Sequence, residues 1–200
     1  MKLSKKTKIC NYIYIIGIIL IGLGRYFAEY FDSTYLSFLI FIFMDALWVS
    51  QVRRRIEHPK ERKYLCWAGL FCALFFFLKT SKYTFIESDT ALSRFFWYMY
   101  YVPQTFTILM IYMASLYVGK PVSYKPKKLY RILFVIAGIL CLLILTNDYH
   151  ELAFDFIGDS NDDYNHGIVY YLSVLWVIVM MAMTFLTILK RSITSDNIQK

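Results

Sequence analysis

The sequence predicts an all-α protein, a polytopic bundle of transmembrane helices. Of its 200 residues, 58% are apolar and 18% are charged, whereas soluble domains average about 45–50% apolar and 25% charged residues. The apolar residues form blocks too long for core strands or ordinary amphipathic helices. Lys and Arg gather between alternate blocks, which is typical of multi-pass membrane proteins. These observations argue against a soluble globular enzyme.

The predicted spans are segments of about 20 mainly apolar residues, the length that crosses a bilayer as a helix. Six segments fit, at residues 9–28, 34–52, 64–78, 95–118, 129–146 and 167–189. The third is the shortest, because its apolar run stops at Lys79, but Lys79 and Lys82 can snorkel to the interface. The first follows several lysines like a signal peptide, yet no small-residue cleavage pattern comes after it, so it is interpreted as an anchor. No linker or repeat divides residues 1–200, so we expect one membrane-embedded domain.

The basic residues predict the orientation. With the N-terminus inside, eighteen of the 22 Lys and Arg residues fall on the inner side, leaving Arg25, Lys79, Lys82 and Arg94. Ten acidic residues fall on the opposite side. Because cytoplasmic loops retain positive charge, we expect both termini in the cytoplasm and the protein in the cell membrane.

Two polar side chains lie near the middle of predicted spans, where they are costly and therefore candidates for function. They are Asp45 in the second span and Gln104 in the fourth. The hypothesis is that Asp45 is protonated or hydrogen-bonded to Gln104 or a tyrosine; the alternative is a polar contact that only fixes helix packing. Pro103, the one proline inside a span, predicts a kink.

Aromatic residues open the fourth span, and Trp97, Tyr98 and Tyr101 are the candidates among them. Rings at this level are typical of an interfacial belt. The alternative is an aromatic-lined outer pocket, bounded by residues 146–150, with Asn147, Asp148 and His150, and by Tyr170 and Tyr171. The sequence leaves both interpretations open.

The outer loop 147–166 is acidic and contains two histidines, a composition that makes it a candidate metal site. Asp159, Asn161 and Asp163 imitate the start of a calcium loop, but Tyr164 replaces the required Gly. No HExxH, nucleotide-binding loop or GxSxG elbow occurs, and the four cysteines form no CxxC pair. We therefore expect a solvated loop, with no metal, no cofactor, no catalytic residue and no nucleic-acid partner.

Four stretches together resemble a known family. They are Val52–Ile56 with Pro59 and Arg62–Leu65, Phe96–Pro103, Leu116–Pro121, and Leu145–Leu152 followed by Gly167–Tyr171. Their order and spacing over residues 51–191 resemble the N-terminal seven-helix membrane region of bacterial histidine kinases. The resemblance implies a sensor in a two-component system, a homodimer, and cytoplasmic kinase and response-regulator partners.

The chain departs from that family in showing six spans and no dimerisation histidine or nucleotide-binding domain after Lys190. We therefore expect either a fragment of a longer kinase or a product that has lost its output domain. The expected function is a membrane signal-input module that passes an extracellular or intramembrane stimulus to an output domain absent from this chain. The alternative is a small transporter or half-transporter with Asp45 and Gln104 as its midplane site. The bilayer is a partner in both, and the stimulus stays unidentified.

Overall fold

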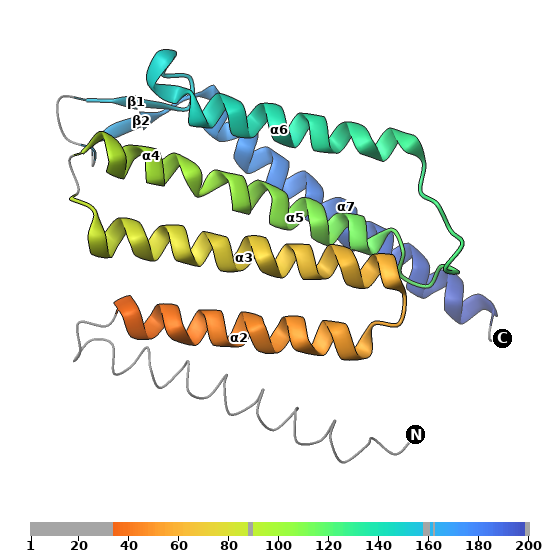
Figure 1. Cartoon of the computed structure of the whole chain (residues 1–200). Helices are drawn as coiled ribbons and strands as arrows, with labels where there is room; N and C mark the ends of the chain where they lie inside the picture. The colour runs from red at the N-terminus through yellow and green to blue at the C-terminus, as the bar shows by residue number, and fades with distance from the viewer. Residues whose placement is uncertain (1–33, 88–89, 158–160, 162, 199–200) are drawn as a thin grey trace.

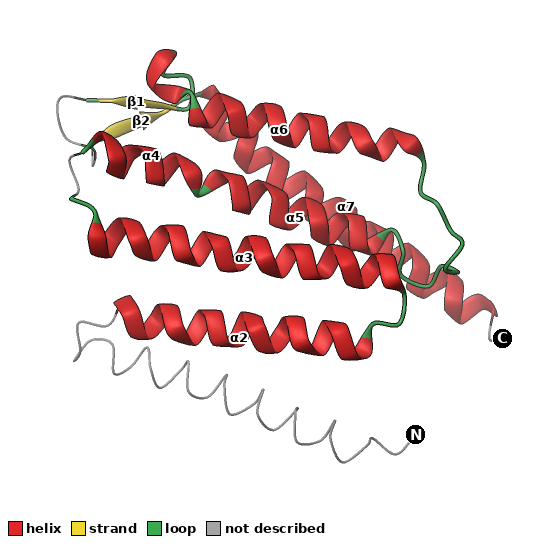
Figure 2. Cartoon of the chain, viewed as in Figure 1, coloured by secondary structure: helices red, strands yellow, loops and turns green. Residues whose placement is uncertain are grey.

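The computed structural model describes residues 34–87, 90–157, 161 and 163–198. The predicted first span, residues 9–28, and both chain termini lie outside the described residues. The described part is a bundle of helices with one small antiparallel hairpin at one end (Figures 1 and 2). Its elements, in order, are α2 (Thr34–Arg55), α3 (Pro59–Phe85), α4 (Ala91–Met99), α5 (Tyr101–Ser115), the 3-10 turn η1 (Lys128–Arg131), α6 (Ile132–Leu145), the 3-10 turn η2 (Asn147–Tyr149), β1 (Phe154–Phe156), β2 (Tyr164–His166) and α7 (Ile168–Ile198).

The helical fold predicted from the apolar blocks is confirmed in its broad form. Within the described residues, three helical segments are long and apolar enough to cross a membrane: Pro59–Phe85, Lys128–Leu145 and Ile168–Ile193. The first of these contains the short third predicted span, which is part of a 27-residue helix. Its start is fixed by His58, whose Nδ1 accepts a hydrogen bond from the Glu61 amide at 3.3 Å, and by Pro59 at the first helical position.

The predicted fourth span is divided into two consecutive helices, α4 and α5, which meet at Tyr100. Proline has no amide hydrogen to donate to the carbonyl four residues earlier, and Pro103 lies four residues after Met99, the last residue of α4. The interruption therefore falls one turn before the proline. Thr90 begins α4 as an N-cap, since its hydroxyl oxygen accepts a hydrogen bond from the Ser93 amide at 3.1 Å.

Helix α5 is the centre of the bundle and contributes more buried residues than any other helix. Helices α3, α6 and α7 surround it, and α2 packs on the far side of α3 (Figure 1). Trp176 of α7 donates its indole N–H to the Thr105 carbonyl of α5 at 3.3 Å. Gly69 allows the close approach of α2 and α3, because a Cβ atom there would collide with the Val49 side chain.

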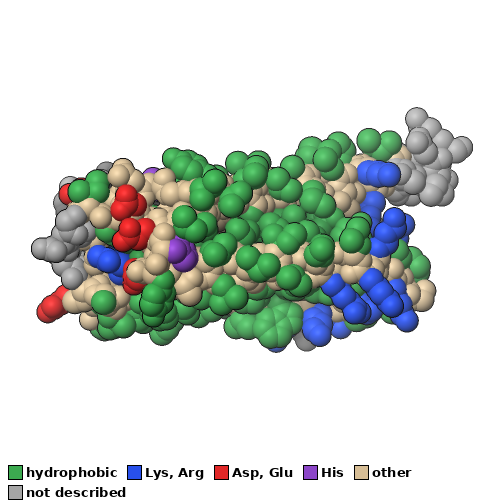
Figure 3. Space-filling model, turned by 90° about the horizontal axis from the view of Figure 1, so that it is seen from above, with side chains coloured by type: hydrophobic (Ala, Val, Ile, Leu, Met, Phe, Trp, Pro, Cys, Tyr) green, Lys and Arg blue, Asp and Glu red, His purple; other side chains and the backbone are tan. Residues whose placement is uncertain are grey.

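The two ends of the bundle differ in charge, as Figure 3 shows. Most of the Lys and Arg side chains in this view lie at the end where α2 stops and α3 starts, which we call the basic end. Most of the Asp and Glu side chains in this view lie at the other end, with the hairpin, which we call the acidic end. Large apolar side chains are exposed along α6 and α7 between the two ends, for example Leu142 and Phe185. A belt of exposed apolar side chains between polar ends is the surface that a bilayer covers.

The predicted solvated loop 147–166 differs from what the structure shows. Residues 154–156 and 164–166 form an antiparallel pair with Asp155 opposite Asn165. Phe154, the first residue of β1, is completely buried. The segment forms a strand because its side chains alternate. Aromatic residues occupy the first and third positions of β1, so they share one face of the strand and can be buried together. These two strands add to the all-α fold predicted from the sequence.

Candidate functional site

The hairpin, the last turn of α4, the start of α5 and the first turn of α7 enclose a group of aromatic rings around Phe154. We call this group the hairpin cluster, and it comprises Trp97, Tyr98, Tyr101, Phe154, Phe156, Tyr164, His166 and Tyr170. Phe154 lies 4.7 Å from Trp97 and 5.6 Å from Tyr101, measured between ring centroids. On the α7 side it lies 5.7 Å from Tyr170. Edge-to-face and tilted pairs of this kind add to the stability gained by burial.

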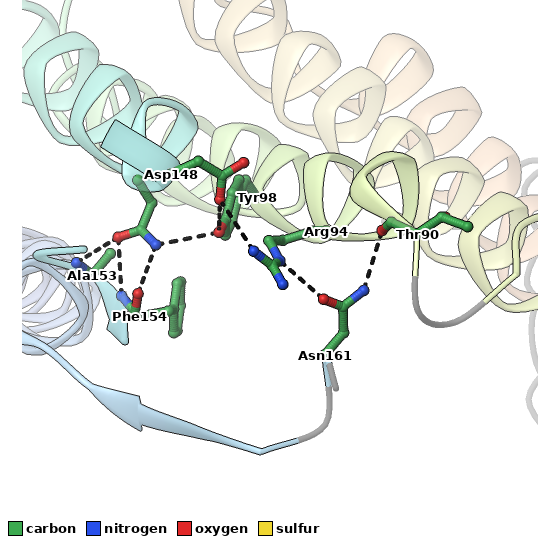
Figure 4. Close-up of polar contacts among 8 residues, drawn as sticks. Thr90, Arg94, Tyr98, Asp148, Ala153, Phe154 and Asn161 are labelled. Atoms are coloured by element: carbon green, nitrogen blue, oxygen red, sulfur yellow. Dashed lines mark hydrogen bonds and ion pairs between the residues drawn. The ribbon is translucent and has the colours of Figure 1, made fainter. Parts of the chain in front are cut away.

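Asn147 holds the loop before the hairpin in place. It is completely buried, and its Oδ1 accepts hydrogen bonds from the amides of Ala153 at 2.8 Å and Phe154 at 3.0 Å. Its Nδ2 donates to the Phe154 carbonyl at 2.7 Å and to the Tyr98 hydroxyl at 3.2 Å. An amide side chain has two donor hydrogens and an acceptor oxygen with two lone pairs, so its hydrogen-bonding capacity is used in full (Figure 4).

The network continues from Tyr98 to a charged pair at the surface (Figure 4). Tyr98, buried on α4, donates its hydroxyl hydrogen to Asp148 Oδ1 at 2.6 Å. The same carboxylate oxygen lies 3.9 Å from Arg94 Nη1, and about half of the Asp148 side chain is exposed, at 51%. Asp148 is thus the point at which the buried network reaches solvent.

Arg94 connects this network to the end of β1 and to Asn161, which lies between the two strands of the hairpin. Its guanidinium carbon lies 4.0 Å from the centre of the Phe156 ring, and its Nε donates to Asn161 Oδ1 at 2.9 Å. Asn161 in turn donates to the Thr90 carbonyl at 3.1 Å, at the start of α4. The side chain that the sequence suggested as part of a calcium motif therefore braces the hairpin against α4, while Asp159 lies outside the described residues.

The turn into α7 is tightly constrained. A Cβ atom at Gly167 would collide with the Leu152 carbonyl oxygen, and Glu151 adopts a positive φ of 53°. His150 lies beside this turn, where its Nδ1 accepts from the Leu152 amide at 3.0 Å and its Nε2 lies 3.3 Å from the Thr146 hydroxyl. The hairpin is therefore joined to α7 through a segment with little conformational freedom.

The structure brings most of the predicted site residues together. Trp97, Tyr98, Tyr101 and Tyr170 are in the hairpin cluster, and the other residues at this end border it: Asn147, Asp148, His150 and Tyr171. Sequence reasoning missed Phe154, Phe156, Arg94 and Asn161 as partners of these residues.

Asp45, Pro103 and Gln104 lie elsewhere. Asp45 of α2 faces Gly69 of α3 and lines a cavity between these helices. Gln104 is exposed on α5, and α3 lies between α2 and α5 (Figure 1). Among the described residues, no hydrogen bond joins Asp45 to Gln104 or to a tyrosine. Pro103 is buried in the first turn of α5.

At the basic end, Arg191 ties α7 to the end of α5. Its Nη1 donates to the Ser115 carbonyl at 2.7 Å and to the Val118 carbonyl, and its Nη2 donates to the Leu116 carbonyl at 2.6 Å. These are carbonyls at and beyond the C-terminus of α5, where intrahelical donors are lacking. We call this contact the Arg191 clamp.

Searches among known proteins give one result. A family model described as the N-terminal 7TM region of histidine kinase matches residues 30–200. No curated protein and no solved structure matches the chain. Within the described residues, no group of three or more His, Cys, Asp and Glu side chains is placed to hold a metal ion.

Proposed function

Because the chain belongs to the family of N-terminal 7TM regions of histidine kinases, we propose that it is a membrane signal-input module. In this proposal it crosses the bacterial plasma membrane six times, with the basic end and both termini in the cytoplasm, as the distribution of Lys and Arg supports. The hairpin cluster then faces outward. It receives an extracellular or intramembrane stimulus and changes the state of a cytoplasmic output domain.

One observation carries the proposal: a single helix, α7, joins the hairpin cluster to the Arg191 clamp. It has 31 residues, which corresponds to about 46 Å at 1.5 Å per residue. It starts directly after β2 and Gly167, and Arg191 lies near its other end. A displacement of the hairpin therefore has a continuous covalent and hydrogen-bonded route to the basic end.

The exposed part of the network is the part that a stimulus can reach. A change at Asp148 acts on the Tyr98 hydroxyl and, through it, on Asn147 and the position of Phe154. The joint between α4 and α5 at Tyr100 gives this side of the bundle a place to bend. A stimulus drives such a change only if the helix bundle has two alternative packing arrangements and the stimulus binds them with different affinities.

The partners follow from family membership rather than from the geometry. We propose a homodimer and a histidine-kinase output that phosphorylates a response regulator, as in two-component signalling. The transporter alternative loses its main support, because Asp45 and Gln104 do not lie together in a shared midplane site.

The test is a chimera in which residues 1–200 are joined to the dimerisation and catalytic domains of a histidine kinase. We expect Asp148→Asn to change autophosphorylation by several-fold, since it removes the charge beside Arg94 and weakens the bond from Tyr98. The control is Asp163→Asn, which removes an exposed carboxylate from the same end. Equal autophosphorylation in Asp148→Asn, Asp163→Asn and the parent chimera would contradict the proposal.

A further inference from the structure

A second feature, independent of the hairpin cluster, is a cavity at the basic end of about 600 Å³. It is bounded by the first turns of α3, the end of α5 and the segment that leads into α6. Six of its lining residues are cationic, and none of the described lining residues is Asp or Glu. The cations are Lys60, Lys63, Lys125, Lys127, Lys128 and Arg131.

The floor of this cavity is apolar and aromatic, in contrast to its rim. Met113 of α5 and Tyr117, two residues beyond the end of α5, are buried there. The ring of Tyr64 stacks on Tyr117 at 5.9 Å between centroids. Lys60 Nζ lies 6.0 Å from the centre of the Tyr117 ring. The cations on the rim are all exposed, so they are available to an anion that enters from the membrane surface.

A second cavity of about 330 Å³ continues from the first. The two share Lys63, Tyr64 and Phe134. The second cavity then follows α3 along Trp67 and Phe71, which come four and eight residues after Lys63 and therefore lie on the same face of the helix. This places the far end of the groove about 12 Å deeper in the membrane than Lys63. Apart from Lys63, its lining side chains are apolar or aromatic.

A cationic rim that opens into an apolar groove matches an amphiphile with an anionic head and a hydrocarbon tail. We propose that the two cavities form a binding site for one anionic phospholipid, with its phosphate among the six cations and an acyl chain along Trp67 and Phe71. Basic pockets between transmembrane helices bind anionic headgroups, and a mainly apolar groove with a few convergent polar groups is typical of ligand sites. Free phosphate would satisfy the rim and leave the groove empty, so the lipid is the occupant that uses both.

The site joins segments that are far apart in the sequence. Lys63 belongs to α3, whereas Lys127 and Lys128 precede α6. Between Val118 and α6 the chain crosses the basic end without a regular helix of its own except η1. A bound phosphate would bring the like charges of these segments together around a shared counter-ion.

Native mass spectrometry of the full 200-residue chain in detergent tests the proposal, with phosphatidylglycerol and phosphatidylcholine as probes. We expect one phosphatidylglycerol to bind about tenfold or more tightly than phosphatidylcholine, and Lys63→Gln/Lys127→Gln to lower that affinity by a similar factor. The matched control is Arg55→Gln/Lys120→Gln, which removes the same charge from the same end but lines neither cavity. Equal losses in the two double variants would overturn the site, because they would reduce it to general attraction by the basic end.

Two further measurements test the lipid site without the Lys63→Gln/Lys127→Gln variant, so they do not depend on whether that variant folds. Excess inorganic phosphate at constant ionic strength should leave phosphatidylglycerol bound; displacement by phosphate alone would show that the groove contributes nothing. The second measurement uses a variant in vesicles that keeps Trp67 as its one tryptophan. Phosphatidylglycerol brominated on its acyl chains should quench the Trp67 fluorescence more than brominated phosphatidylcholine does at the same mole fraction. Equal quenching by the two lipids would place ordinary bilayer lipid, not a selected anionic one, beside Trp67.

Discussion

The Tyr98 hydroxyl and the Asp148 carboxylate are 2.6 Å apart, although the two residues are 50 positions apart in the chain. The donor is buried on α4 and the acceptor is half exposed after α6, so this bond connects the interior of the hairpin cluster with solvent.

Replacing this donor tests how much the bond stabilises the fold. We predict that Tyr98→Phe lowers the free energy of unfolding by about 1–2 kcal/mol, because it leaves Asp148 and Asn147 each without one partner. Thermal unfolding in detergent measures the change. Tyr171→Phe is the control, since Tyr171 is exposed; equal effects of the two substitutions would show that the Tyr98 bond carries no stability.

Asn147 should be more sensitive than Tyr98. Asn147→Ala leaves the amides of Ala153 and Phe154 and the Phe154 carbonyl without their buried partner, and we predict a loss of about 3 kcal/mol or more. Hydrogen exchange at residues 153 and 154 should accelerate at the same time. Asn165→Ala, in the exposed part of β2, should leave that exchange unchanged; protected amides in Asn147→Ala would contradict the network as described.

Two glycines give opposite predictions for the same substitution. Gly69→Ala places a methyl group against Val49 and should destabilise the α2–α3 pair by about 1–3 kcal/mol. Gly138→Ala on α6 meets nothing within 4 Å and should be neutral or stabilising by up to about 1 kcal/mol. The free energies of unfolding of both variants, measured under the same conditions, check the two predictions. A Gly69→Ala variant as stable as the parent would mean that α2 does not approach α3 this closely.

The Arg191 clamp predicts a local effect at the other end. Arg191→Gln removes donors from the carbonyls of Ser115, Leu116 and Val118, so the last turn of α5 should open more often. We expect amide exchange across residues 115–120 to rise about tenfold, which corresponds to about 1.4 kcal/mol. Lys120→Gln removes an exposed cation from the same segment and should leave the exchange as it is.

The helices could be predicted from the sequence because their signal is local. An apolar run such as that of α6 has to be a helix wherever lipid surrounds it, since the backbone must satisfy its own hydrogen bonds. The break between α4 and α5 at Tyr100 could also be predicted, since Pro103 has no amide hydrogen to donate to a helical hydrogen bond.

The hairpin was missed because acidic and turn-forming residues surround it. Its signal is the alternation of Phe154, Asp155 and Phe156, which is typical of a strand with one buried face. That signal is only three residues long, so polar composition outweighed it. The contact between Arg94 and Asn161 gave no signal in the sequence, because it depends on how the hairpin folds back onto α4.

The pairing of Asp45 with Gln104 illustrates a different limit. Position along a span gives the depth of a residue, but it gives neither the order of helices nor the rotation of each one. Both residues lie within helices, yet α3 stands between them. The basic cavity was missed for the same reason, since Lys63 and Lys127 belong to separate basic segments of the sequence.

The Arg191 clamp also determines how α7 can move along its axis. Its guanidinium fits three carbonyls that project from one turn, and a partial slide would leave those oxygens and the cation without partners in a poorly solvated place. Intermediate positions are therefore higher in free energy than either the engaged state or one in which the contact is fully released. We predict that axial displacement of α7 is all-or-none: the Arg191 clamp is either formed or broken, and intermediate positions are rarely populated. A gradually increasing displacement of the hairpin would then change the basic end in one step.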